Sequence, residues 1–290
     1  MRMRELQTDF RALFSGRLLA ALCALLLAVA PAAAESVSDW SEDHASRARL
    51  LDGGADGSHR LAGIEIDLDP GYHTYWRHAG DSGLPPAIDW SGSRNVAEAE
   101  LLFPAPARFA DLSGSFFGYA AHVVLPLRVT PVDPQAPIDL RIALEYGVCK
   151  EICIPARADL ALALGSPPSE GHPAVEQALA RVPRPVAFGD TGPLGFLGVE
   201  IVGPDRLTVR VRAPEGATLF AEGPNYRWFL DPQPEMASAA GGEGSFEVEI
   251  AAKPREPAGL ADLRLTLVGG DDAVESVFTL DAADLAENGR

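Results

Sequence analysis

The chain has 290 residues, of which 24 are basic and 41 acidic, and its formal net charge is −17 at pH 7. So acidic a surface argues against nucleic acid or anionic lipid as a partner, because both carry negative charge themselves. High solubility is the simplest consequence of this charge. The length allows two domains of ordinary size. The 28 glycines and 24 prolines, with few long helical patterns, indicate mostly β structure.

The first 34 residues have the pattern of a secretory signal peptide. Four arginines precede the apolar run Leu18–Ala30, whose thirteen residues are too few to span a bilayer, which takes a helix of about 20. The small residues of Pro31–Ala34 form a cleavage site, so we expect the mature chain to start at Glu35. Loss of four basic and two acidic residues then leaves 20 against 39, a net charge of −19. We expect a soluble protein without a membrane span, exported to the periplasm, where disulfides are permitted.

Residues 35 to 60 carry no recognisable motif, and strand-like runs follow from Leu61 onward. The first run alternates apolar and polar residues, as a half-buried strand does. Prolines make the segment Phe103–Phe109 extended, and Ser115–Tyr119 is interpreted as an aromatic loop. Pro126 predicts an edge strand or a bulge, because proline cannot donate to a sheet. The strands expected in this half are Leu61–Leu68, Tyr72–Arg77, Ala121–Val129, Ile138–Glu145 and Ala158–Leu164.

Cys149 and Cys153 are the two cysteines of the expected mature chain, since Cys23 lies in the signal peptide. On a straight strand, residues four positions apart are about 13 Å apart, at roughly 3.3 Å per residue. A disulfide needs Cα atoms within about 7 Å of each other. If the two cysteines pair, the chain must therefore turn between them. The three-residue connection Lys150–Ile152 favours a hairpin end or a bulged turn.

The chemistry of this pair has three interpretations on spacing alone. A disulfide across so short a loop stabilises a fold by only about 2 kcal/mol, and a domain of this length buries a large core without it. A short, exposed disulfide is typical of the labile, redox-active kind. Lys150 favours a thiolate, whereas Glu151 opposes it. A structural disulfide and a Cu(I) site of two thiolates and one histidine, either His73 or His122, remain as alternatives.

The second half of the chain begins with a linker-like segment, Gly165–Gly171. Pro173–Val182 is predicted to be a short helix, because proline suits the first turn and apolar residues line one side. Beyond about residue 190, seven short runs separated by turns predict a second β-sandwich without cysteine or histidine. No nucleotide-binding loop, Ser/His/Asp arrangement or paired-carboxylate pattern stands out. The seven runs are Leu197–Val202, Leu207–Val211, Thr218–Ala221, Tyr226–Leu230, Phe246–Ile250, Leu263–Val268 and Val274–Leu280.

Several motifs in the first half resemble the N-terminal periplasmic domain of the thiol:disulfide interchange protein DsbD. They also resemble that of the related suppressor-of-copper-sensitivity membrane reductases. The resemblance covers roughly residues 40–165, and the cysteine segment with its following proline is its most specific part. In chain order, the motifs are Gly-Tyr-x-x-Tyr from Gly71, a Trp-containing strand at Trp90, Phe-Phe-Gly-Tyr from Phe116 before a Leu-Pro-Leu strand, and Gly-x-Cys…Cys-x-Pro from Gly147.

The resemblance implies an immunoglobulin-like β-sandwich that carries a redox cysteine pair, matched here by Cys149 and Cys153. In that family, the pair takes electrons from a membrane-embedded partner by way of a thioredoxin-like domain. It passes them to periplasmic thioredoxin-like proteins for disulfide isomerisation or cytochrome c maturation. The resemblance also implies that the later cysteine, Cys153, forms the mixed disulfide.

Aromatic residues are the second feature that the resemblance carries over. Phe116 and Phe117 match a cap loop that shields the cysteine pair, with Phe116 as the expected lid. Tyr72 and Tyr75 match aromatic residues that line the site. Without the resemblance, Phe116 and Phe117 fit plain core packing equally well. For Tyr72 and Tyr75 the core interpretation is the stronger one, because aromatic strands usually face a core.

The sequence departs from the family pattern in three ways. Three residues rather than five separate the cysteines, so the hairpin end is tighter. In the family, acidic residues come just before the cap aromatic residue, but this sequence has Gly114 and Ser115 there. Asp111 is the nearby acidic residue that could substitute for them. Transmembrane and thioredoxin-like parts are missing from this sequence, so electrons are expected to come from a separate protein.

The sequence therefore predicts an all-β protein in four parts. These are a signal peptide at 1–34, a redox domain at 35–165, a linker with a short helix at 166–189, and a second, smaller β-sandwich at 190–290. The hypothesis is a thiol–disulfide exchange module that needs no cofactor and relays electrons between a membrane thiol reductase and periplasmic thioredoxin-like proteins. Whether it turns over a small substrate is left open. The alternatives are a periplasmic copper-binding or copper-delivery protein using the same cysteines, and an adhesion or interaction sandwich with a structural disulfide.

Overall fold

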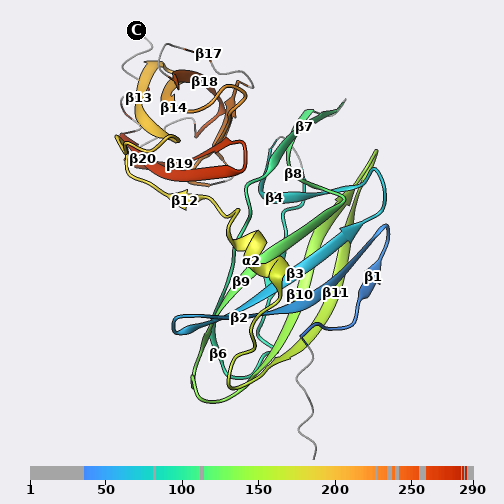
Figure 1. Ribbon diagram of the computed structural model, residues 1–290. Coiled ribbons are helices and arrows are strands. Elements are labelled where there is room, and N and C mark those ends of the chain that lie inside the picture. Colours follow the sequence, from blue (N-terminus) through green and yellow to red (C-terminus); the bar gives the residue numbers. More distant parts are fainter. Residues whose placement is uncertain are drawn as a thin grey trace, which may run out of the picture. The chain divides into compact units, whose positions relative to one another are not determined.

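The computed structural model describes residues 36–80, 83–111, 114–225, 227–233, 237–238, 242–254, 259–281, 283 and 285. The expected signal peptide lies outside the described residues. Nearly all of the regular structure is β-strand, arranged in four sheets that form two sandwiches (Figure 1). The expected all-β, immunoglobulin-like class with a short helix is confirmed.

The first sandwich consists of a five-stranded and a six-stranded antiparallel sheet that share one apolar core. The largest side chains of this core are Trp76 and Tyr146. One sheet has the order β1 (Ser41–Asp43), β2 (Ser46–Asp56), β3 (His59–Leu68), β9 (His122–Pro131), β6 (Val96–Leu101). The other has the order β11 (Cys153–Leu164), β10 (Ile138–Cys149), β4 (His73–Gly80), β8 (Gly114–Ala120), β7 (Ala107–Asp111), with β5 (Ala87–Asp89) beside β10.

The hairpin of β10 and β11 shows how the sequence pattern produces this fold. Leu140, Ile142 and Leu144 are buried, and the residues between them face outward, because successive side chains on a strand point to opposite faces. β11 alternates in the same way from Ala156 onward. A one-residue slip would expose every one of these apolar side chains. The register is therefore fixed along the whole hairpin, down to its end at Cys149 and Cys153.

The second sandwich has its own core, centred on Phe196 and Phe246. One sheet has the order β12 (Arg184–Pro185), β20 (Asp272–Asp281), β19 (Leu260–Gly269), β15 (Thr218–Glu222). The other has the order β13 (Gly195–Gly203), β14 (Arg206–Arg212), β18 (Glu243–Ala252), β16 (Phe229–Pro232), with β17 (Ala237–Ser238) beside β18. Six of the seven runs expected from the sequence fall on strands, and the two-residue strands β12 and β17 are additional. The remaining run, Tyr226–Leu230, reaches β16 only at Phe229 and Leu230, and Tyr226 lies outside the described residues.

A single short helix, α2 (Pro173–Leu179), lies between the two sandwiches in sequence. Its N-cap is His172, whose side chain accepts a hydrogen bond from the backbone N–H of Ala174, and proline opens its first turn. Val175 is fully buried against the first sandwich. The helix was expected to end at Val182 but ends three residues earlier, at Leu179. Turns then lead the chain to Pro183.

Three local expectations differ from the structure. Strand β2 was missed, because its end, Gly53 to Asp56, is rich in glycine and aspartate. The aromatic segment Ser115–Tyr119, expected to be a loop, is part of β8, which pairs with β4 and β7 on its two sides. These two ladders supply hydrogen-bond partners for the backbone of β8. Gly118 lets β4 approach closely, because a Cβ at this position would lie 2.0 Å from the carbonyl oxygen of Thr74.

The expectation that Pro126 marks an edge strand or a bulge is wrong. Its strand, β9, is an inner strand between β3 and β6, and Pro126 pairs in regular register with Gly63. The carbonyl of Pro126 accepts a hydrogen bond from the N–H of Leu102, just beyond the end of β6. In an antiparallel strand the N–H and C=O of one residue point to the same neighbour. The nitrogen of Pro126, which carries no hydrogen, therefore points to the chain just beyond the end of the β6–β9 ladder. No hydrogen bond of that ladder is lost there.

Candidate functional site

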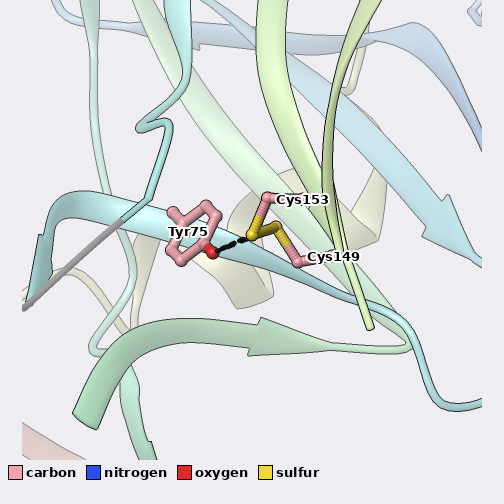
Figure 2. The surroundings of a disulfide bond; sticks show 3 residues. All are labelled: Tyr75, Cys149 and Cys153. Atoms are coloured by element: carbon pink, nitrogen blue, oxygen red, sulfur yellow. Dashed lines mark hydrogen bonds between the residues drawn. A yellow bond between two sulfur atoms is a disulfide. The ribbon is translucent and has the colours of Figure 1, made fainter. Parts of the chain in front are cut away.

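The two cysteines form a disulfide at the end of the β10–β11 hairpin, with Cα atoms 4.1 Å apart (Figure 2). They are direct register partners, and the N–H of Lys150 bonds to the carbonyl of Ile152 across the turn at 3.4 Å. The expected hairpin-end geometry is therefore observed. The two cysteines differ in burial, because Cys149 is 1% exposed and Cys153 belongs to the exposed class. An incoming group thus meets Cys153 first.

Tyr75 is the polar group that touches this disulfide. Its hydroxyl oxygen lies 2.8 Å from the sulfur of Cys153 and 3.0 Å from the sulfur of Cys149 (Figure 2). A disulfide has no S–H, so the phenol O–H is the donor and a sulfur the acceptor. The ring itself is 2% exposed, which leaves the hydroxyl held against the two sulfurs.

Two glycines make room for the Tyr75 ring. A Cβ at Gly83 would lie 2.4 Å from the ring, and a Cβ at Gly147 would lie 2.9 Å from it. Non-bonded carbon atoms are in optimal contact at about 3.5–4.0 Å, so any larger residue at either position would push the ring away. The backbone N–H of Gly147 also donates a hydrogen bond to the carbonyl of Leu84 at 3.0 Å. This bond holds the segment of Gly83 and Leu84, between β4 and β5, against β10.

An aromatic stack covers the buried side of the disulfide. The ring of Phe116 stacks on His73 with centroids 4.0 Å apart and on Phe109 with centroids 5.0 Å apart. His73 is the register partner of Cys149 on the neighbouring strand β4. Phe116 also meets the ring of Tyr75 edge-on, at 6.1 Å. Phe116 therefore belongs to the apolar cluster that encloses Cys149.

The other two aromatic residues expected at the site lie differently. Phe117 meets Phe220 of the second sandwich edge-on at 4.9 Å, and it belongs to the main core rather than to the cluster around Cys149. Tyr72 precedes β4, and the ammonium group of Lys150 lies 5.5 Å from the centre of its ring. Tyr72 thus reaches the hairpin end through Lys150, whereas Phe117 faces away from the disulfide.

The site also contains His73 and Phe109, which sequence reasoning did not place there as site-lining residues. His73 was considered only as a possible metal ligand, and Phe109 only as part of an extended segment. Both reach the site through strand pairing, because β4 lies between β10 and β8, and β8 lies between β4 and β7. The pattern of one strand does not reveal its neighbours, so the sequence held no direct signal for either residue.

The outer surface of the hairpin end is mixed in character. Lys150 and Glu151 are exposed, and the two isoleucines that flank Cys153 are exposed as well, Ile152 at 75% and Ile154 at 36%. Exposed apolar side chains next to a reactive group provide contact area for a visiting surface. The end of the hairpin is therefore both accessible and partly apolar.

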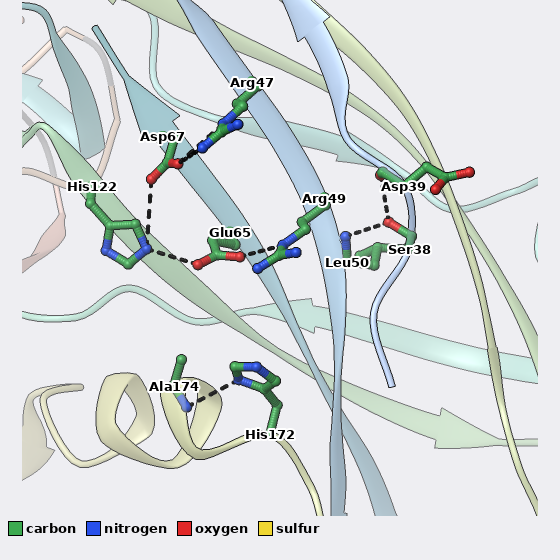
Figure 3. A network of polar contacts seen from close by, with 10 residues as sticks. All are labelled: Ser38, Asp39, Arg47, Arg49, Leu50, Glu65, Asp67, His122, His172 and Ala174. Carbon is green, nitrogen blue, oxygen red and sulfur yellow. Dashed lines mark hydrogen bonds and ion pairs between the residues drawn. The ribbon is translucent and has the colours of Figure 1, made fainter. Parts of the chain in front are cut away.

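The second histidine considered as a metal ligand lies elsewhere. His122 is on β9, in the other sheet, and its Nε2 is 3.0 Å from Glu65 and 4.0 Å from Asp67 (Figure 3). Burial raises the pKa of Glu65, but hydrogen bonds with His122 and Arg49 lower it by more. The pKa of Glu65 therefore lies below its usual value. Within the described part of the chain, no group of three or more His, Cys, Asp and Glu residues is placed to hold a metal ion.

Comparison with known proteins places the first sandwich in context. Residues 45–165 match the family described as thiol:disulfide interchange protein DsbD, N-terminal. The structure is similar to the crystal structure of the N-terminal periplasmic domain of ScsB from Proteus mirabilis, with a TM-score of 0.67 and 21% sequence identity. That match covers 85% of this chain and 98% of the other. The resemblance expected from the sequence is confirmed, and the similarity to ScsB shows the fold.

Two further results complete the comparison. The conserved domain protein from Bacillus anthracis covers 86% of this chain and 90% of its own length, but its TM-score of 0.23 and 10% identity carry no argument. No curated protein matches the chain. Separately, none of the helices in the described ranges is long and apolar enough to cross a membrane. The family match and the hairpin-end disulfide together support thiol–disulfide exchange as the class of chemistry.

Proposed function

We propose that this chain, whose residues 45–165 match the DsbD N-terminal family, is a periplasmic thiol–disulfide exchange module. It relays electrons between a membrane thiol reductase and thioredoxin-like proteins that serve disulfide isomerisation or cytochrome c maturation. The observation that carries the proposal is the asymmetry of the disulfide: Cys149 is enclosed under aromatic rings, and Cys153 is exposed at a hairpin end. A disulfide that serves only stability needs no such exposure.

Reduction begins at the exposed sulfur. A thiolate of the donor protein attacks Cys153, a new S–S bond joins the two proteins, and the bond between Cys153 and Cys149 breaks. Cys149 leaves with the electron pair and takes up a proton. The second thiolate of the donor then attacks the donor's own sulfur and releases Cys153. Two electrons have passed to this chain, and the donor has become a disulfide.

Transfer to the acceptor is the same chemistry in reverse. The thiolate of Cys153 attacks the disulfide of a thioredoxin-like acceptor and forms a mixed disulfide, and one acceptor thiolate leaves. Cys149 then loses its proton and attacks Cys153, which restores the intramolecular disulfide and releases the reduced acceptor. In this scheme Cys153 exchanges with partners and Cys149 resolves the intermediate.

Tyr75 is suited to assist both directions. Its hydroxyl is within hydrogen-bond distance of both sulfurs, so it can donate to whichever sulfur carries negative charge. A hydrogen bond to a charged group stabilises it by about 1.5–3 kcal/mol. Tyr75 therefore lowers the energy of the leaving thiolate without moving, because two glycines and β10 already hold its ring in place.

The aromatic stack acts as the cover of the site. Phe116, which contacts both His73 and Phe109, closes the side of the disulfide that the hairpin end does not expose. A closed cover shields Cys149 from small reagents, and it moves when a protein partner docks. Tyr72 has a lesser part, since it contacts Lys150 at the hairpin end.

Trapping of the mixed disulfide tests this proposal. The Cys149→Ser variant keeps the exchanging thiol but lacks the resolving one. We therefore expect it to accumulate a disulfide-linked adduct with an oxidised thioredoxin-like protein. The Cys153→Ser variant should accumulate little, because its remaining thiol is buried. Mass spectrometry of the adduct identifies the partner cysteine. The double variant Cys149→Ser with Cys153→Ser is the control. No adduct from either single variant would contradict the relay.

Copper binding is the alternative, and the position of His73 opposite Cys149 is the observation that bears on it. In that case the reduced protein should bind Cu(I) tightly, and both Cys149→Ser and His73→Ala should abolish binding. A relay should instead show a reduction potential near that of its partners, whereas a purely structural disulfide should fall below about −300 mV. Copper titration and redox titration of the same preparation separate the three cases.

A further inference from the structure

The hairpin of β7 and β8, which carries the cover of the disulfide, has two faces with different neighbours. In its register Phe109 pairs with Phe116, and Arg108 pairs with Phe117. Directly opposite residues share a face, and successive residues alternate between faces. Phe109 and Phe116 therefore lie on the face toward His73 and the disulfide, and Arg108 and Phe117 lie on the other.

The second face contacts the second sandwich. The guanidinium of Arg108 donates to the carbonyl oxygen of Pro232 at 2.6 Å and to the carboxylate of Asp231 at 2.8 Å, both on β16. The side chain of Arg108 is 14% exposed, so these are not ordinary surface contacts. Phe117 meets Phe220 of β15 edge-on at 4.9 Å. One polar and one aromatic contact thus tie the outer face of the hairpin to the second sandwich.

A separate set of contacts joins the sandwiches away from the hairpin. Arg77, on β4, donates to Glu222 at 2.6 Å and forms a further short ion pair with Glu275. Phe220 belongs to both sets, because its ring contacts Trp76 of β4, with centroids 5.6 Å apart, as well as Phe117. Both sandwiches belong to one compact unit of the chain. Loss of Arg108 would leave the Arg77 contacts in place, so the hairpin contacts are not needed merely to join the sandwiches.

From this arrangement we infer that the second sandwich braces the cover of the disulfide. Arg108 and Phe220 are positioning residues: they hold the outer face of the β7–β8 hairpin and thereby keep Phe116, on its inner face, over Cys149. The inference rests on the proposed function in taking the Cys149–Cys153 pair as an exchange site. It gives the second sandwich, which has no cysteine, a part in the reaction. A partner that opens the cover must first release this hairpin from β15 and β16.

The test measures the rate at which a small reductant, dithiothreitol, reduces the disulfide in the full chain. Dithiothreitol attacks the exposed Cys153, and a loosened cover admits water to Cys149, the leaving thiolate. We expect Arg108→Ala to raise the rate of reduction by about tenfold, the size expected for loss of a hydrogen bond between charged groups. The reduction potential should not change, because the disulfide and Tyr75 are untouched. Arg108→Lys should lie between, since lysine can reach Asp231 as a point charge but cannot bond to both groups in a fixed fork.

Two further variants keep the test decisive. Arg210→Ala removes an exposed arginine of the second sandwich that pairs with Glu200 at 3.3 Å, and it should leave the rate unchanged. If Arg108→Ala does not fold, Phe220→Leu carries the test, because it keeps an apolar side chain but loses the edge-on contact with Phe117. Circular dichroism establishes that each variant is folded. A folded Arg108→Ala or Phe220→Leu variant that is reduced at the wild-type rate overturns the brace.

The brace and the relay fail in different ways. If Arg108→Ala accelerates reduction by dithiothreitol but Cys149→Ser traps no thioredoxin-like protein, the brace stands and the relay falls. If trapping succeeds and Arg108→Ala is reduced no faster than the wild type, the relay stands and the brace falls. An effect of Arg108→Ala that is not partly rescued by Arg108→Lys also counts against the brace, because the hydrogen bonds would then not be its cause.

Discussion

The two sandwiches each contain a long antiparallel hairpin, and the ends of these hairpins differ. In the second sandwich, β19 and β20 are joined by the two-residue turn Gly270-Asp271, and Gly270 has a positive φ of 65°. Glycine takes this conformation without steric penalty, and two-residue turns of this kind match the twist of the strands. That hairpin is closed by backbone geometry alone.

The hairpin of the first sandwich is closed in another way. Its turn, Lys150–Ile152, contains no glycine and no residue of positive φ, and a disulfide joins the residues on either side. The register of β10 and β11 is already set by buried leucines far from this turn. A long hairpin in this fold therefore does not always need a covalent closure, which is consistent with the exchange chemistry proposed for the disulfide at the first one.

Removal of the disulfide should break this comparison most strongly. The Cys149→Ser, Cys153→Ser double variant should lose all thiol–disulfide exchange but only about 2 kcal/mol of stability, the loop-entropy effect of so short a ring. Gly270→Ala at the other hairpin should lose about 1–2 kcal/mol, because alanine is strained at positive φ, and should exchange at the wild-type rate. Denaturant unfolding of the oxidised proteins measures the effect on stability, and exchange with glutathione disulfide after prior reduction measures the effect on chemistry. A double variant that fails to fold would show that the disulfide is structural.

A glycine substitution beside Tyr75 should have the next largest effect. Gly147→Ala places a methyl group 2.9 Å from the Tyr75 ring, so we expect a loss of about 1–3 kcal/mol from overpacking and slower exchange, because the hydroxyl moves off the sulfurs. The matched control in the second sandwich is Gly203→Ala, whose Cβ would meet nothing within 4 Å. Equal stability and exchange rates for the two variants would contradict the role given to this close packing.

Loss of the Tyr75 hydroxyl should affect chemistry more than stability. Tyr75→Phe removes the donor to the sulfurs, and we expect alkylation of the reduced protein by iodoacetamide to require a higher pH and exchange to slow by about tenfold. The control is Tyr146→Phe, whose hydroxyl bonds to Ser46 at 2.7 Å and not to sulfur. It should lower stability without moving the pH profile of alkylation. An unchanged profile for Tyr75→Phe would remove Tyr75 from the mechanism.

The smallest effect concerns the sheet that does not carry the disulfide. The pKa of Glu65 is lowered: burial raises it, but the hydrogen bonds with His122 and Arg49 outweigh burial. A lowered folded-state pKa contributes stability that is present above the usual value of 4.5 and is lost as the pH falls below it.

In Glu65→Gln, the fall in the free energy of unfolding between neutral and acidic pH should therefore be smaller than in the wild type, by less than about 1 kcal/mol. The rate of exchange should not change. Glu100→Gln, which breaks a more exposed pair with Arg128, is the control and should change less. Thermal unfolding at a series of pH values measures both variants. An identical acid dependence for wild type and Glu65→Gln would exclude this cluster as a source of acid sensitivity.

Much of the fold could be predicted from the sequence because strands leave a two-residue period in it. The runs at Ile138–Glu145 and Ala158–Leu164, and six of the seven runs of the second sandwich, fall on strands. Two of the failures have a common origin in pairing between strands. The sequence around Pro126 predicts an edge or a bulge because it does not show which strands flank β9. The sequence of Ser115–Tyr119 predicts a loop because the two ladders that hold this segment are not visible in its own pattern.

The site divides in the same way. From the spacing of Cys149 and Cys153 alone it follows that the chain must turn between them if they pair, because four residues of straight strand hold the two cysteines too far apart. The three-residue connection favours a hairpin end or a bulged turn. Only the tertiary structure decided that Cys149 is enclosed and Cys153 exposed, and that Phe116 faces the disulfide while Phe117 faces Phe220. Neighbouring residues on a strand point to opposite sides, and which side meets which neighbour is set by the register of β7, β8 and β4 together, a property that none of these segments has alone.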